Sequence, residues 1–150
     1  MTDSARIDPA GSEAASPAFV RARAAARIVL AIAYFFVGVA HIRSPHGFVA
    51  IVPSWVPFPR QTVFVTGLCE LAGSIALLTN RLRWWAGVML AAYAVCVYPA
   101  NINHAIHGIA VGGTRLGWWY HGPRLAAQPL IVWWALFAGE VTEWPFRRRR

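Results

Sequence analysis

The chain has 150 residues, of which 57% are hydrophobic and only 13% are charged, and its mean hydropathy is +0.45. Soluble domains carry about 25% charged residues, so this composition argues against an ordinary water-soluble surface. The net charge is +8, but the arginines lie between apolar blocks and at the termini, which is not the pattern of a nucleic-acid-binding face. Two cysteines without a CxxC motif exclude a disulfide scaffold.

The N-terminal part divides into a polar tail and a first apolar block. Residues 1–22 are mostly small and polar, and we expect a disordered tail there. The apolar run behind three arginines predicts a membrane-spanning helix over about residues 24–43, which snorkelling arginine side chains can extend. Small residues before His41 would also suit a signal-peptide cleavage site, so that alternative stays open.

The stretch 44–60 contains four prolines, and no continuous helix can pass through it. It is nevertheless aromatic and apolar, so we expect it at the membrane interface or folded back over the helices. The next three apolar blocks predict helices over about residues 61–80, 84–104 and 124–144. We expect a kink at Pro99 and a loop over residues 105–123.

These elements predict an all-α chain, namely a polytopic membrane four-helix bundle over residues 23–146 with a basic tail at 147–150. Ten arginines fall on the side that holds both termini and four fall on the other side. The positive-inside rule therefore predicts a multi-pass protein of a bacterial-type inner membrane with both termini cytoplasmic. The lipid bilayer is its first expected partner.

The topology places polar side chains from all four helices in one half of the membrane. They are His41, Glu70, Asn101, His104 and Gln128. An ionisable group in lipid is costly, so Glu70 should face the bundle interior and find a partner such as His41 or His104. We interpret this set as a ligand-binding or proton-relay site, and hydrogen bonding between helices is the alternative, above all for Asn101 and Gln128.

Other reactive side chains carry weaker signals. His104 and His107 are three residues apart, but no recognised ligand spacing is present, so metal or haem binding is a secondary alternative and no metal site is predicted. Cys69 and Cys96 are expected to be small apolar core residues. We expect the two acidic residues at the end of the last helix to pair with arginines. They are Glu140 and Glu143, with Arg27 or Arg81 as partners.

Four separated segments resemble the DoxX-like family of small membrane proteins. They are GVAH ending at His41, VPSWVP from Val52, GLCELAG from Gly67 and YPANI from Tyr98. The resemblance covers about residues 25–145 and implies a four-helix membrane protein. It also implies that His41, Glu70, Asn101 and His104 occupy recurrent polar positions of the family.

The resemblance implies a function in membrane redox chemistry, because some DoxX-like proteins are associated with thiosulfate:quinone oxidoreductase or with oxidative-stress complexes. The expected role is a redox-associated subunit that binds a quinone-like or other small apolar ligand beside a membrane or peripheral oxidoreductase. Whether the chain is itself an enzyme stays open, and the missing CxxC argues against thiol oxidoreduction. The alternatives are a non-catalytic lipid or small-molecule binding or transport protein and a structural assembly subunit of a membrane complex. A second copy of the chain, in a homo-oligomer, is a further candidate partner.

Overall fold

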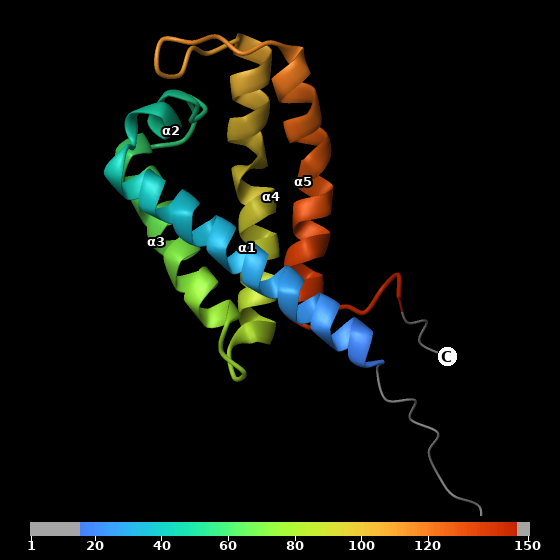
Figure 1. Cartoon of the computed structure of the whole chain (residues 1–150). Coiled ribbons are helices and arrows are strands. Elements are labelled where there is room, and N and C mark those ends of the chain that lie inside the picture. Colours follow the sequence, from blue (N-terminus) through green and yellow to red (C-terminus); the bar gives the residue numbers. More distant parts are fainter. Residues whose placement is uncertain (1–15, 147–150) are drawn as a thin grey trace, which may run out of the picture.

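The computed structural model describes residues 16–146, and this part of the chain is helical without a named strand. Its helices are α1 (Pro17–Arg43), α2 (His46–Ala50), α3 (Pro59–Leu77), α4 (Arg83–His107) and α5 (Trp118–Ala138) (Figure 1). The predicted all-α class is confirmed for the described residues.

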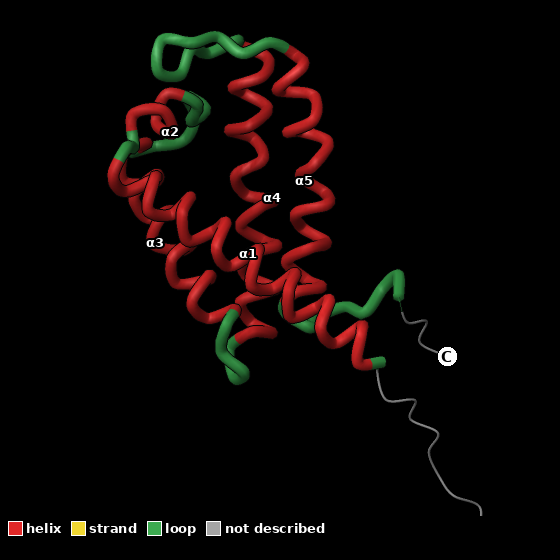
Figure 2. The backbone as a smooth tube through the Cα atoms, in the orientation of Figure 1, coloured by secondary structure: helices red, strands yellow, loops and turns green. Residues whose placement is uncertain are grey.

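The four long helices pack in two pairs, α1 with α3 and α4 with α5. The pairs meet at one end of the molecule, where small and branched apolar side chains interdigitate. This core contains Leu30, Ala31, Tyr34, Leu77, Ala86, Leu90, Ala91, Ala135 and Ala138. The start of α1 and the segment after α5 lie at this core end, whereas α2 and the 108–117 loop lie at the opposite end (Figures 1 and 2).

The first helix begins earlier than expected. Residues 17–22 belong to α1 rather than to a disordered tail, because Ser16 and Pro17 make a favourable helix start. The Ser16 hydroxyl accepts a hydrogen bond from the Phe19 amide at 3.3 Å, and Pro17 lacks the amide hydrogen that the first turn leaves unpaired. The rest of the expected N-terminal tail and the basic tail at 147–150 lie outside the described residues.

The predicted loop over residues 105–123 is wrong at both of its ends. The helix α4 continues to His107, where Gly108 adopts a left-handed φ of 53° and ends it. The helix α5 begins at Trp118 and accommodates Pro123, so it lies about six residues earlier than the predicted span 124–144. It ends at Ala138, where the backbones of Gly87 and Gly139 approach so closely that a Cβ on Gly139 would lie 2.5 Å from the Gly87 Cα.

Two helices, α1 and α4, are long and apolar enough to cross a membrane. Their outward faces carry large apolar side chains, including Phe36, which is 66% exposed, and Met89, which is 64% exposed. Such faces are better matched to lipid than to water. By length and composition, residues 16–146 therefore contain two candidate membrane spans.

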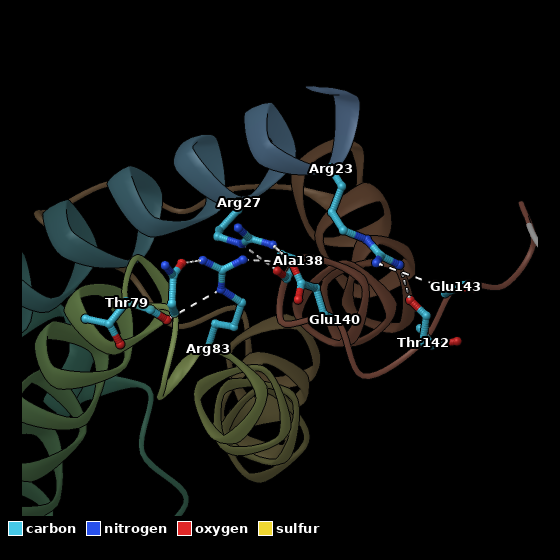
Figure 3. Close-up of polar contacts among 9 residues, drawn as sticks. Arg23, Arg27, Thr79, Arg83, Ala138, Glu140, Thr142 and Glu143 are labelled. Atoms are coloured by element: carbon cyan, nitrogen blue, oxygen red, sulfur yellow. Dashed lines mark hydrogen bonds and ion pairs between the residues drawn. The ribbon is translucent and has the colours of Figure 1, made fainter. Parts of the chain in front are cut away.

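An ionic cluster closes the core end of the molecule (Figure 3). The Glu140 Oε1 accepts hydrogen bonds from Arg27 Nη2 at 2.5 Å and from Arg83 Nη1 at 2.8 Å. Arg27 Nε also donates to the Ala138 carbonyl at 2.8 Å, which caps the end of α5. We call Arg27, Arg83 and Glu140 the arginine clasp, because they join α1 and α4 to the end of α5.

The clasp confirms the predicted pairing of Glu140 with Arg27, but Arg83 rather than Arg81 is its second partner. Beside it, Arg23 Nη1 lies 4.0 Å from Glu143 Oε1, and Arg23 Nη2 donates to the Thr142 carbonyl at 2.8 Å (Figure 3). The Arg23 guanidinium also lies over the rings of Phe19 and Phe137, at 4.8 and 4.7 Å from their centroids. These contacts fix the first turns of α1 against the C-terminal segment.

The clasp should make stability dependent on acidic pH. Burial raises the pKa of the Glu140 carboxyl, but hydrogen bonds from Arg83 and Arg27 outweigh this and hold the pKa below its ordinary value of 4.5. Below about pH 4.5 the unfolded carboxyl binds a proton more readily than the folded one, so stability should fall with pH until the folded group is also protonated. Thermal unfolding of the purified protein between about pH 6 and pH 3 measures this loss. Glu140→Gln should remove this component, and the same pH dependence in both proteins would contradict the assignment.

Candidate functional site

Glu70 of α3 is the most deeply buried acidic side chain among the described residues, with 3% of its surface exposed. Its Oε1 accepts a hydrogen bond from the Tyr93 hydroxyl of α4 at 2.8 Å. Its Oε2 lies 2.9 Å from Nδ1 of His41, which is 8% exposed at the end of α1. Three helices therefore converge on one carboxyl group, and His41 rather than His104 is its histidine partner.

Close contact between α1 and α3 brings His41 against Glu70. A Cβ on Gly67 would lie 2.8 Å from the His41 Cβ, and a Cβ on Gly38 would lie 2.9 Å from the Gly67 carbonyl oxygen. Only glycine allows the two backbones to approach in this way. The small residues around Glu70 thus serve helix packing and set the position of the histidine.

The contacts of His41 define which ring nitrogen is available. Its Nδ1 is 2.9 Å from the Val37 carbonyl, which can only accept, so Nδ1 carries a hydrogen and donates it there. The Glu70 Oε2 is at ion-pair distance from the same nitrogen but accepts no aligned hydrogen bond. The ring stacks on Phe48 of α2, with centroids 3.7 Å apart. Phe48 and the Val37 carbonyl fix the ring, while Nε2 stays without a partner among the described residues.

A pocket of about 280 Å³ opens beside His41 at the α2 end of the molecule. It is lined by His41, Ile42, Pro45, His46, Val49, Arg60 and Phe64. Most of this wall is apolar, with a few nitrogen-bearing side chains, which is the usual character of a small-molecule site. His41 contacts both the pocket and the buried carboxyl group, so it connects the two.

The other predicted polar residues lie on a different interface, between α4 and α5. Asn101 Nδ2 donates to Gln128 Oε1 at 3.3 Å, and Gln128 Nε2 donates to the Ala94 carbonyl at 2.5 Å. Within residues 16–146, no hydrogen bond or ion pair joins these amides to Glu70. They hold two helices together, which is the alternative that the sequence left open for them.

His104 also belongs to the α4–α5 side. Its Nδ1 lies 3.1 Å from Nη1 of Arg124, which can only donate, so Nδ1 accepts and Nε2 donates to the Ile109 carbonyl at 3.0 Å. The expected single cluster of His41, Glu70, Asn101, His104 and Gln128 is therefore divided into two. Sequence spacing gives the depth of a residue along its helix. The packing of the helix pairs decides which neighbouring helix each face contacts.

The histidines at the ends of α4 and α5 do not form the pair expected from spacing. His107 is exposed and bonded to the Asn103 carbonyl, whereas His104 contacts the ring of His121, at 4.6 Å between centroids. Across the described part of the chain, no group of three metal-ligating side chains is assembled. The predicted ligand-binding residues did not include His46, Arg60 or His121, because no periodic pattern links these side chains to Glu70.

Both cysteines differ from the core positions expected for them. Cys69 and Cys96 are free thiols on the outer surface of their helices. Cys69 precedes the buried Glu70, so the two adjacent side chains of α3 point to opposite environments. Cys69 therefore offers a control position beside the candidate site.

Comparison with known proteins adds a family but no activity. No curated protein and no solved structure is significantly similar to the chain. One family model, described as a domain of unknown function (DUF8561), matches residues 30–139, which include both polar interfaces. The chain therefore belongs to the DUF8561 family.

Proposed function

We propose that the chain is a polytopic membrane protein whose four long helices cross the bilayer, as the resemblance to DoxX-like proteins implies. The helices α3 and α5 pack along the candidate spans α1 and α4 and expose apolar side chains such as Phe64 and Leu130. Both ends of the described chain lie at the arginine-rich core end, which supports a cytoplasmic location for that end in a bacterial-type inner membrane (Figure 1).

Within this membrane protein, the pocket beside His41 is proposed to bind the head group of a quinone-like ligand. One observation carries the proposal: His41 lies between the pocket and the buried Glu70 carboxyl, with Nε2 free of any other described partner. A quinone carbonyl needs a hydrogen-bond donor and, on reduction, a proton. Because Nδ1 of His41 already donates to the Val37 carbonyl, Nε2 can supply both only from the protonated imidazolium, a form that histidine reaches near neutral pH.

The proposed role is that of a redox-associated subunit. Reduction of a quinone to a hydroquinone takes two electrons and two protons. The electrons would come from a membrane or peripheral oxidoreductase partner, and His41 would pass protons from solvent to the ligand oxygens. Glu70 would stabilise the protonated imidazole, while the Tyr93 hydroxyl holds the carboxylate in place.

A quinone-binding experiment tests this role. A tetrasubstituted benzoquinone, which has no free ring carbon for thiol addition, should quench the tryptophan fluorescence of the purified protein. In Glu70→Gln the affinity should fall about tenfold, because a charge-assisted contact to His41 is lost. Cys69→Ser, on the outer face of the same helix, should bind as the parent does. Unchanged quinone binding and turnover in Glu70→Gln would overturn the proposal.

A second candidate function is non-catalytic binding or transport of a small apolar molecule or lipid. It is favoured by the lining of the pocket, where Ile42, Pro45, Val49 and Phe64 outnumber the polar side chains. Saturable binding without any ligand reduction in the presence of the partner oxidoreductase would support this function over the redox role.

A further inference from the structure

The polar side chains that line the pocket include a positive charge, and no acidic side chain is among them. Arg60 and His46 both line the pocket, and neither side chain makes a hydrogen bond or ion pair with any described residue. No carboxylate lines the pocket, because Glu70 lies behind His41. An exposed guanidinium that lines a pocket can donate charge-assisted hydrogen bonds to an oxygen of a bound ligand.

The pocket includes a buried side chain in a fixed orientation, so it is more than a patch of exposed charge. His41, with 8% of its surface exposed, lines the pocket with a ring that Phe48 and the Val37 carbonyl fix, and its Nε2 has no partner among the described residues. Arg60 is the second residue of α3, so the positive end of that helix dipole lies beside the guanidinium. The donors and the dipole favour the same kind of ligand group, an oxygen that bears negative charge.

We propose that the pocket selects ligands with an ionised oxygen on a flat apolar ring, of the hydroxyquinone type. Arg60 and His46 hold the ionised oxygen, the protonated His41 donates from Nε2 to a ring carbonyl, and Phe64 and Val49 cover the apolar body. This selectivity rests on the proposed function of the pocket as a ligand site and adds the charge class of the ligand to it.

Two matched naphthoquinones separate this proposal from the proposed function. The probes are 2-hydroxy-1,4-naphthoquinone, which is ionised at neutral pH, and 2-methoxy-1,4-naphthoquinone, which is neutral. Binding is measured by tryptophan quenching with the full chain carrying Cys69→Ser and Cys96→Ser, so that no thiol adds to the ring. The ionised probe should bind about tenfold more tightly, and this preference should weaken at high salt.

Variants of Arg60 test whether its guanidinium causes the preference for the ionised probe. Arg60→Gln should bring the two affinities close together by weakening the ionised probe, whereas Arg60→Lys should keep most of the preference. Arg115→Gln, at a residue that does not line the pocket, should behave as the parent does. Equal binding of both probes to the parent, or an equal loss of both in Arg60→Gln, would overturn the charge selectivity and leave the proposed function intact. Failure of both probes to bind would overturn the proposed function as well.

Discussion

Glu140→Ala is expected to lower the free energy of unfolding by about 2 kcal/mol, although it removes a single carboxylate. The variant removes the carboxylate that Arg27 and Arg83 share and leaves them only neutral acceptors, and the side chains of these arginines are only 11% and 18% exposed. Leaving one member of a buried ion pair uncompensated costs about 3–5 kcal/mol, and the 42% exposure of the Glu140 side chain reduces that figure. Thermal or denaturant unfolding in detergent measures the change.

The backbone conformation at Glu140 allows a second variant that separates backbone strain from the loss of the carboxylate. Glu140 adopts a left-handed φ of 64° directly after the C-cap of α5, where glycine is the usual residue. The Val141 amide donates to the Leu136 carbonyl at 2.9 Å and the Glu140 amide to the Phe137 carbonyl at 3.2 Å, which completes a Schellman motif. Glu140→Gly removes the strain together with the carboxylate, so it should be about 1 kcal/mol more stable than Glu140→Ala but still less stable than the parent.

Glu143→Ala provides the matched control for the clasp. Its carboxylate is 4.0 Å from Arg23, which keeps the Thr142 carbonyl and two aromatic rings as partners. The loss of stability should therefore be smaller than in Glu140→Ala. Parental stability of Glu140→Ala would show that the arginine clasp contributes nothing to folding.

Gly67→Ala is expected to lower stability by about 1–3 kcal/mol and to weaken the proposed quinone binding as well. The added methyl group would lie 2.8 Å from the His41 Cβ and 3.1 Å from the Gly38 carbonyl oxygen. Both obstacles are on or next to the backbone of α1, so rotation of a flexible side chain cannot remove the clash. The helices must separate, and His41 then moves away from Glu70.

Gly122→Ala makes the same chemical change where there is room for it. Apart from its chain neighbours and the local helix backbone, no atom lies within 4 Å of the Cβ position at Gly122 of α5. Alanine there should be close to neutral, because its better helix propensity is offset by the proline that follows, which disfavours a helical residue with a Cβ. Thermal unfolding and quinone titration of both variants separate packing from helix propensity. Equal stability of Gly67→Ala and Gly122→Ala would contradict the close contact of α1 with α3.

The agreement between predicted and observed helix boundaries differs from one helix to another. For α3 and α4 the apolar blocks between arginines and polar turns gave both boundaries within three residues. For α5 the predicted span 124–144 lay about six residues too late, because the helix accommodates Pro123 in its first turns and the apolar run continues past its true end. The end of α5 depends on the approach of Gly139 to Gly87, which are far apart in the sequence.

The sequence by itself determined the helical class, the apolar outer faces and the choice of Glu70 as the costliest buried group, because these follow from composition and from depth along a helix. Only the tertiary structure decided that Glu70 pairs with His41, that Asn101 and Gln128 belong to another interface, and that Arg60 completes a pocket. The physical reason is that each long helix can rotate about its axis without changing its hydrophobic pattern very much. Close contacts such as Gly38 with Gly67 fix that rotation, and they are properties of pairs of helices rather than of any one segment.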